Sequence, residues 1–134
     1  MLESLTKTVL VVDDDETARM FVKAVMEGLG WLTLEARDGE EGLDLAEHEH
    51  PDLIILDVSM PGKDGMDVFY DLRTHHVTEK IPIIFLTAIN SRKDGVRYTA
   101  DEIEAAYGVP GPEGFVDKPV DGAFLTQCVM GVMG

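Results

Sequence analysis

Four short apolar runs in this chain each end in polar residues, and this pattern constrains the fold more than any other feature. The runs are Val9–Val12, Leu53–Leu56, Ile83–Leu86 and Phe115–Val116, and they are followed by Asp13-Asp14, Asp57, Thr87 and Asp117-Lys118-Pro119. If the runs are parallel strands, these polar residues gather at one edge of the sheet. In open α/β sheets ligands bind at that edge, outside the carboxyl ends of the strands. The pattern therefore predicts a polar site built from several strand ends.

Helical patterns alternate with the strands along the whole chain. Strands are expected at residues 8–12, 31–36, 53–56, 81–86 and 114–116, and helices at about 18–29, 38–48, from Met66, 99–108 and 120–133. Such alternation implies a parallel sheet covered by helices on both faces. The right-handed crossover rule leaves few topologies for this string of elements. We expect a flavodoxin-like, doubly wound five-stranded sheet with strand order 2-1-3-4-5.

Size and composition limit the class of protein. With 134 residues, 45% of them hydrophobic, the chain is expected to form a single domain over residues 1–134 with no output domain. The N-terminus lacks a signal peptide, no apolar run could span a bilayer, and the one cysteine, Cys128, fits a reducing compartment. These features favour a cytoplasmic protein that does not insert into membranes. A formal charge of −15 argues against nucleic-acid binding, which depends on basic residues.

Adjacent acids at a strand end are a poor structural choice, because like charges at close range raise each other's pKa. A cation removes that cost at Asp13 and Asp14, and Mg²⁺ prefers such oxygen ligands together with phosphate oxygens. The alternative is a solvated loop, or a helix N-cap by Asp14 or Asp15. Asp57 could be a metal ligand, a general base or a nucleophile that forms an acyl phosphate, or else an ordinary turn residue.

A hydroxyl and an ammonium complete the set at these strand ends. Thr87 could donate to a phosphoryl oxygen, or simply be a β-branched strand residue, and Lys118 could hold a phosphate or lie on the surface. All four features fall at the same end of successive strands. Together they would suit one divalent metal and one phosphoryl group.

The chain resembles the receiver domain of two-component response regulators, including the single-domain chemotaxis regulators. The matching stretches are Val11–Glu16, Pro51–Asp57 with Met60-Pro61-Gly62 and Gly65, Pro82–Ala88, and Gly114–Pro119. They run in order over nearly the whole chain, so the resemblance is highly specific.

The resemblance implies a role for each matching residue. Asp57 corresponds to the phosphoacceptor, and Asp13 and Asp14, with the Ser59 main-chain carbonyl, to the ligands of Mg²⁺, for which Mn²⁺ could substitute. Thr87 and Lys118 correspond to the residues that bind the phosphoryl oxygens, and Phe115 to the switch aromatic.

The partners implied are a histidine kinase or histidine phosphotransfer protein, and a downstream target protein. The target would contact the face made by the fourth helix, fifth strand and fifth helix. Catalysis would be confined to the protein's own phosphorylation and dephosphorylation, and it would act as a monomer or as a phosphorylation-dependent dimer.

The segment from residue 88 to 112 is longer than the family usually shows, since Thr87 and Lys118 lie 31 positions apart. It carries three basic residues, Arg92, Lys93 and Arg97. We expect the segment to make a partner-specific contact, and the alternative is a tolerated surface insertion. Ser59 and Ile89 occupy the positions that tune access of water to the acyl phosphate. The branched side chain of Ile89 predicts slower self-dephosphorylation than a polar residue would give at this position.

Two other functions remain as alternatives. A haloacid-type phosphatase also uses a strand-end aspartate nucleophile, but it needs a second acid two positions later, where this chain has Ser59. A receiver-like scaffold that never takes phosphate is disfavoured because Asp13, Asp14, Asp57, Thr87 and Lys118 are all present.

Overall fold

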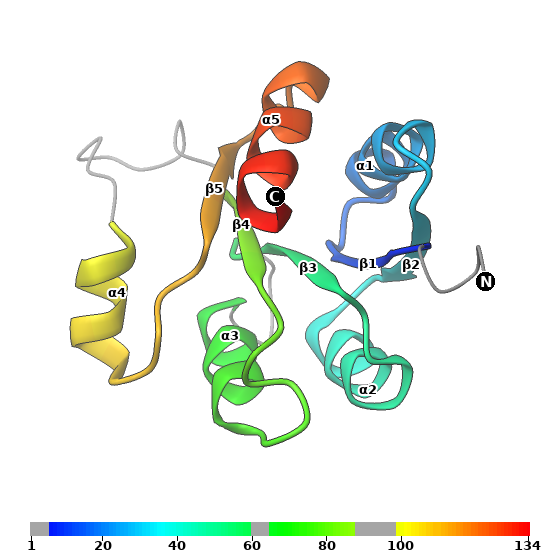
Figure 1. Ribbon diagram of the computed structural model, residues 1–134. Helices are drawn as coiled ribbons and strands as arrows, with labels where there is room; N and C mark the ends of the chain where they lie inside the picture. The colour runs from blue at the N-terminus through cyan, green and yellow to red at the C-terminus, as the bar shows by residue number, and fades with distance from the viewer. Residues whose placement is uncertain (1–5, 60–64, 88–98) are drawn as a thin grey trace.

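Strands and helices alternate along the chain in the computed structural model, which describes residues 6–59, 65–87 and 99–134. The strands in these ranges are β1 (Thr8–Val12), β2 (Leu32–Ala36), β3 (Leu53–Asp57), β4 (Ile83–Thr87) and β5 (Gly114–Asp117). The helices are α1 (Glu16–Gly28), α2 (Gly39–Glu49), α3 (Gly65–Thr74), α4 (Ala100–Tyr107) and α5 (Gly122–Met133). Figure 1 shows their arrangement around the sheet.

The five strands form one parallel sheet in the order β2-β1-β3-β4-β5, which confirms the predicted topology. The central strands β1, β3 and β4 are almost entirely apolar because both faces of the sheet are buried. Their carboxyl ends point the same way, so the residues that follow them meet at one edge.

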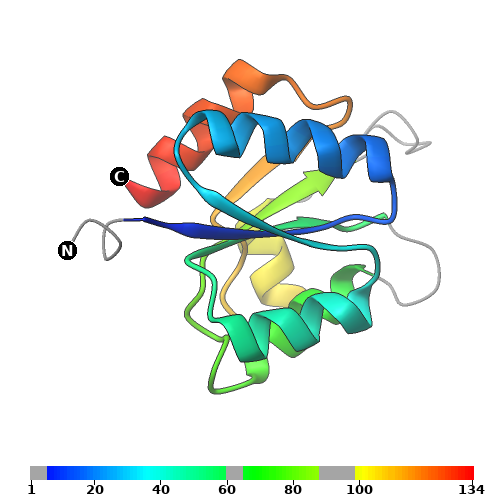
Figure 2. The ribbon, with the colours of Figure 1, turned by 90° about the vertical axis from the view of Figure 1, so that its right-hand side faces the viewer.

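Helices cover the sheet on both sides, as Figure 2 shows, with α1 and α5 on one face and α2, α3 and α4 on the other. Alternate strand residues divide between two cores. Val9, Val11, Ile55 and Ile84 pack with α1 and α5, whereas Leu10, Ile54 and Phe85 pack with the other three helices. These two cores hold the strands in place and so position the residues at their carboxyl ends.

Side chains at the helix starts explain why three helices begin where they do. Asp15 caps α1 by accepting a hydrogen bond from Thr17 N, and Thr99 and Glu102 form a capping box at α4. Asp38 also caps α2 through Glu41 N, but the Glu41 carboxylate accepts from Arg37 N instead of the cap residue. Asp38 and Glu41 therefore form only half of a capping box at α2.

Several element boundaries differ from the expected ones by one or two residues. The fourth strand begins at Ile83, not 81, because Pro82 has no N–H to donate to the ladder. The last helix begins at Gly122, not 120, because Asp121 caps it by accepting from Phe124 N. At the other end of the strands, β3, β4 and β5 each extend by one residue to include Asp57, Thr87 and Asp117.

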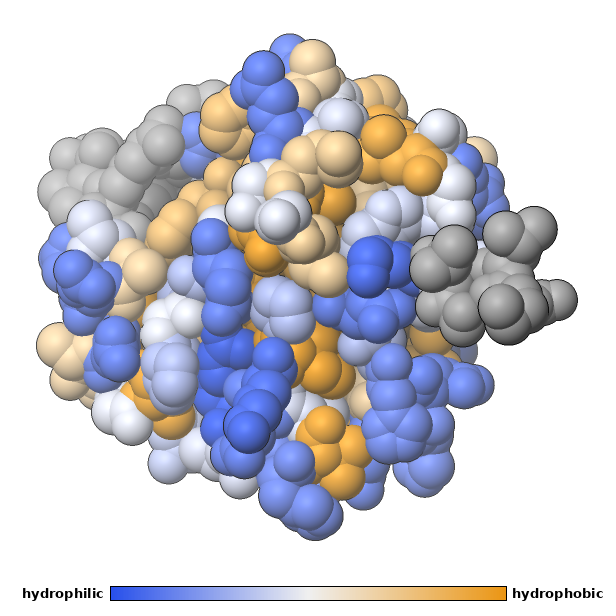
Figure 3. Space-filling view, in the orientation of Figure 1, coloured by the Kyte–Doolittle hydropathy of each residue, from blue (hydrophilic) through white to orange (hydrophobic). Residues whose placement is uncertain are grey.

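The surface is mixed in character. Figure 3 shows hydrophilic residues over much of one face, with apolar residues gathered toward α5. This helix carries no charged residue, and Phe124 and Met130 on it are exposed. Within the described residues, no helix is long and apolar enough to cross a membrane.

Candidate functional site

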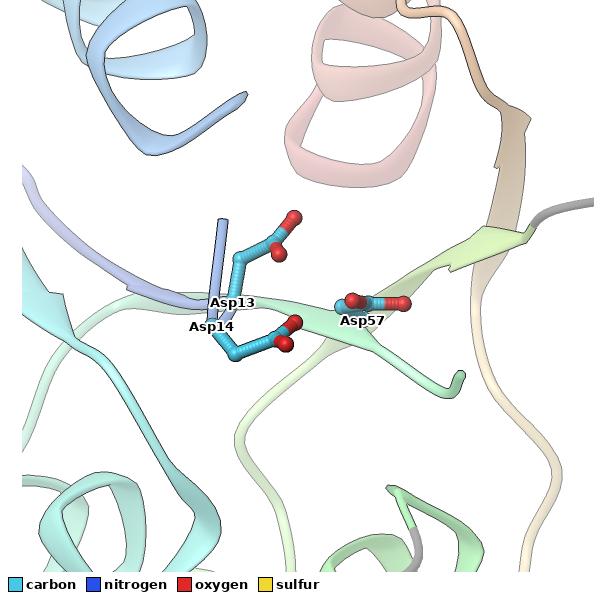
Figure 4. Close-up of side chains that lie close together, drawn as sticks. All are labelled: Asp13, Asp14 and Asp57. Carbon is cyan, nitrogen blue, oxygen red and sulfur yellow. The ribbon is translucent and has the colours of Figure 1, made fainter. Parts of the chain in front are cut away.

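Three carboxylates converge at the carboxyl edge of the sheet, as Figure 4 shows. Asp13 and Asp14 follow β1, and Asp57 ends the neighbouring strand β3. Carboxylate oxygens of the three residues all lie within 4.8 Å of one another. Asp13 and Asp57 are buried whereas Asp14 is exposed, because adjacent residues at a strand end cannot both point the same way. The predicted acidic cluster is therefore present.

The Asp57 carboxylate is held at both oxygens. Oδ1 accepts hydrogen bonds from the main-chain N of Ser59 at 2.9 Å and from its hydroxyl at 2.6 Å. Oδ2 accepts from the Lys118 ammonium at 3.1 Å. With both oxygens bound, the carboxylate has a defined orientation.

Lys118 bridges the two buried acids. Its Nζ lies 2.8 Å from Asp13 Oδ2 and 3.1 Å from Asp57 Oδ2. The lysine comes from the end of β5, at the far side of β4 from β3, so its long side chain reaches across the sheet edge to these acids. The ammonium is the positive charge that compensates the two buried carboxylates in this state.

The three groups respond differently to this arrangement. Burial raises the pKa of Asp13 to about 6, although Lys118 and the N–H of Asp15 act in the opposite direction. Burial also acts to raise the pKa of Asp57, but the hydrogen bonds from Ser59 and the charge of Lys118 outweigh it and lower the pKa. For Lys118, burial acts to lower the pKa, and the two acids together raise it. Asp57 is thus kept ionised at neutral pH.

The donor set fits a hard divalent cation. Asp13 Oδ2 is buried and, among the described residues, receives no well-directed hydrogen bond, so the Lys118 ammonium is its sole charge partner there. A buried carboxylate oxygen without a hydrogen-bond donor is costly unless a cation satisfies it. Together with the nearby oxygens of Asp14 and Asp57, it offers what Mg²⁺ prefers. The acidic cluster could therefore bind a metal ion.

Thr87 lies at the same edge, but its hydroxyl is directed elsewhere. Its Oγ1 donates to Asp117 Oδ1 at 2.8 Å, and both side chains are half-buried. The expectation that the hydroxyl joins the acids and the ammonium is therefore only partly met. The residue is at the site, but its donor is bound to a carboxylate on β5.

Phe115 lies two residues before Asp117 on the same face of β5. It is half-buried and packs edge-to-face against Phe85, with ring centroids 5.7 Å apart. Phe85 in turn packs edge-to-face on Phe69 of α3. The aromatic ring is thus part of the core beneath the pair formed by Thr87 and Asp117.

The contacts of two residues at the site were not predicted from sequence, although Asp117 was expected at this edge. Arg19 of α1 donates from Nη1 to the Asp13 main-chain oxygen at 2.8 Å and pairs with Glu35 of β2. Asp117 is the other, through its bond to Thr87. Helical periodicity places Arg19 on the first turn after the acidic pair, but its partner Glu35 is sixteen positions further along, and sequence spacing does not show that contact.

Some of the predicted features lie outside the described residues. These are Ile89, Met60-Pro61-Gly62 and the basic residues Arg92, Lys93 and Arg97. The role assigned to Ile89 and the function of the long segment therefore stay predictions. Ser59 is described, and its side chain is exposed beside Asp57.

Known proteins share this fold and this sequence pattern. The family model for the response regulator receiver domain matches residues 9–129. The polar-differentiation response regulator DivK of Brucella ovis is 29% identical over 130 residues, which are 97% of this chain and 98% of that protein.

Two solved structures are similar as well. A putative response regulator from Chloroflexus aurantiacus is 30% identical, with a TM-score of 0.79 over 96% of this chain and 98% of that one. The chemotaxis protein CheY4 of Vibrio cholerae is 26% identical, with a TM-score of 0.78 over 95% and 98% of the two chains.

Proposed function

The chain belongs to the response regulator receiver domain family, and from this premise we propose that it accepts a phosphoryl group on Asp57 and signals by protein contact. Receiver domains are signalling modules of two-component systems, and their partners are histidine kinases and downstream effectors. The observation that carries the proposal is the Asp57 carboxylate, which is buried and is oriented by Ser59 and Lys118 beside two further acids.

The proposed reaction is a phosphoryl transfer from a phosphohistidine of a kinase or phosphotransfer protein. An Asp57 oxygen attacks phosphorus in line, the new O–P bond forms, and the P–N bond to the imidazole breaks with its electron pair leaving on nitrogen. A low pKa keeps Asp57 available as the carboxylate nucleophile. Ser59 holds one oxygen of Asp57, which fixes the direction of the other.

Asp13, Asp14 and Asp57 are the side chains that would hold Mg²⁺, with the Ser59 main-chain carbonyl as a further ligand. The metal supplies neutralisation of the charge that develops on the phosphoryl oxygens. Lys118 already spans Asp13 and Asp57, so a short movement of its ammonium would bring it onto a phosphoryl oxygen.

The proposed change in conformation follows from the negative charge that the phosphoryl group adds. A phosphoryl group brings roughly −1.5 to −2 charges at neutral pH, which attracts Lys118 and the Thr87 hydroxyl. Movement of Thr87 frees space for Phe115 to turn inward, and this biases the surface formed by α4, β5 and α5. Ser59 and Ile89 would set the lifetime of the acyl phosphate through access of water.

The direct test is intact mass after incubation with acetyl phosphate and Mg²⁺. We expect one added phosphoryl group on the wild-type protein and none on Asp57→Asn, or on the wild type in the presence of a chelator. Asp71→Asn, which changes an acid on α3, is the matched control and should accept phosphate like the wild type. An adduct of equal yield on Asp57→Asn would overturn the proposal.

A further inference from the structure

We propose that Asp117 is a positioning residue for Thr87, holding its hydroxyl in the unphosphorylated protein and competing with the phosphoryl group for it. The inference rests on the proposed phosphorylation of Asp57 and adds a device that regulates the same site. The bond from Thr87 Oγ1 to Asp117 Oδ1, 2.8 Å long, is the observation from which it starts.

The sheet register places the two residues side by side. Thr87 and Asp117 are paired across β4 and β5, at the last position of each strand. Neighbouring residues in register point to the same face of a sheet. Two positions earlier, Phe85 and Phe115 are paired in the same way and are in contact. The polar pair therefore lies directly above the ring that is proposed to switch.

The bond also determines where the hydroxyl points. β4 lies between β3, which carries Asp57, and β5, which carries Asp117 (Figure 1). A Thr87 hydroxyl that donates to β5 is turned toward the side opposite the phosphoacceptor. To reach a phosphoryl group on Asp57, the side chain must rotate and leave Asp117.

Hydrogen-bond chemistry makes this a competition between two acceptors. A threonine hydroxyl has one proton to donate, whereas an ionised carboxylate and a phosphoryl oxygen are both acceptors only. Thr87 can therefore satisfy Asp117 or the phosphoryl group, but not both at full strength. A hydrogen bond to a charged acceptor is among the stronger ones, so its loss must be offset before the switch occurs.

The negative charge of Asp117 also opposes binding of the phosphoryl group. The described edge includes the carboxylates of Asp13, Asp14, Asp57 and Asp117 and the ammonium of Lys118. A phosphoryl group added here meets the negative charge of Asp117 near the residue that should bind it. Removing Asp117 would free the hydroxyl and lower this repulsion together.

The proposal predicts that Asp117 weakens binding of a phosphoryl analogue. Beryllium fluoride with Mg²⁺ is the probe, and its dissociation constant is measured by calorimetry for wild type, Asp117→Ala and Asp117→Asn. We expect about tenfold tighter binding by Asp117→Ala, the factor that one charge-assisted hydrogen bond represents. Asp117→Asn keeps an acceptor without the charge, so its dissociation constant should lie between those of the wild type and Asp117→Ala. Glu104→Gln, which removes an exposed charge from α4, should bind like the wild type.

A double-mutant cycle separates the hydrogen bond from the charge. In a Thr87→Ala background the competition is gone, so Asp117→Ala should change affinity by much less than tenfold. An equal gain in both backgrounds would show that Asp117 acts by its charge alone, and this would overturn the positioning role.

A second readout needs no phosphoryl group. Three-bond couplings measured by NMR on the Thr87 side chain should report one χ1 rotamer in the wild-type protein and averaging between rotamers in Asp117→Ala. A single rotamer in both proteins, or averaging in both, would contradict the proposal. If Asp117→Ala fails to fold, the similarly shaped Asp117→Leu, which also lacks an acceptor, allows the same measurement.

The two readouts also distinguish the proposals from each other. If neither wild type nor Asp57→Asn binds beryllium fluoride, the proposed function fails, and the Thr87 couplings still decide whether Asp117 holds the hydroxyl. If wild type binds and Asp117→Ala binds with the same dissociation constant, the function stands and the role of Asp117 is refuted.

Discussion

Asp13 and Asp57 are both buried carboxylates next to Lys118, yet their pKa values move in opposite directions. Asp57 accepts two hydrogen bonds from Ser59 in addition to its contact with Lys118, whereas Asp13 has one main-chain donor, Asp15 N. Donors that stabilise the ionised form decide whether burial raises a pKa. The residue with more donors is suited to be an ionised nucleophile, and the other to bind a cation.

The pKa of Asp13 predicts how stability changes with pH when no divalent metal is present. Its folded pKa of about 6 lies above the ordinary 3.8, so the folded form binds the proton more tightly between these values. The contribution of this group to stability is therefore fully present below pH 3.8 and is lost as pH rises through 6. At neutral pH, ionised Asp13 costs about 3 kcal/mol on this basis.

Urea unfolding of wild type and Asp13→Asn in a chelator tests this prediction. The variant should be the more stable protein at pH 7, and the gap should narrow as the pH falls toward 4. Asp57 does not obscure the effect, because its lowered pKa makes its own contribution fall only at more acid pH. Asp14→Asn, which changes an exposed acid of the same cluster, is measured alongside as the control. A difference in stability between wild type and Asp13→Asn that does not change with pH would contradict the raised pKa of Asp13.

At the scale of elements, one buried arginine joins parts of the chain that lie far apart in sequence. Arg73 of α3 is 4% exposed and donates to the main-chain oxygens of Ile81, Pro110 and Gly111. It also pairs with Glu113 at 2.7 Å and lies over the ring of Phe69. These contacts tie α3 to the turn before β4 and to the segment that connects α4 to β5, so they help to position α4.

Replacing Arg73 should therefore be strongly destabilising. We expect Arg73→Ala to lower the free energy of unfolding by about 3 to 5 kcal/mol, because three carbonyls and a carboxylate lose their donor. Arg73→Lys should recover only part of this, since one ammonium cannot replace a planar group that donates in several directions.

The control is Arg37→Ala, which removes an exposed pair with Glu41 at 3.9 Å, with side chains 75% and 41% exposed. It should cost less than about 0.5 kcal/mol. Urea midpoints and slopes of all three variants give their free energies of unfolding. A loss for Arg73→Ala as small as that of the control would show that the contacts of Arg73 are not important for stability.

For the whole molecule, the features set by local pattern were predictable and those set by packing between distant elements were not. The apolar runs and helical stripes gave the strand order, the two covered faces and the gathering of Asp13, Asp57 and Lys118 at one edge. The parallel register that pairs Thr87 with Asp117 depends on how β4 and β5 pack.

Packing between distant elements also explains the other differences between the predicted and the observed structure. Arg19 and Arg73 act through main-chain oxygens, which every residue carries, so their partners leave no mark in the sequence. The exact ends of strands and helices depend on single caps such as Asp121, which compete with several equally suitable neighbours. The extent of the domain over residues 1–134 and the contact made by the long basic segment stay predictions.

The most direct test of the account is to locate the phosphoryl group by chemistry that only an acyl phosphate undergoes. The protein is treated with acetyl phosphate and Mg²⁺ and then with borohydride, which reduces an aspartyl phosphate to homoserine, and its peptides are mapped by mass spectrometry. We expect homoserine at position 57 alone. Homoserine at another aspartate, or a phosphate that survives borohydride on a hydroxyl side chain, would contradict the account.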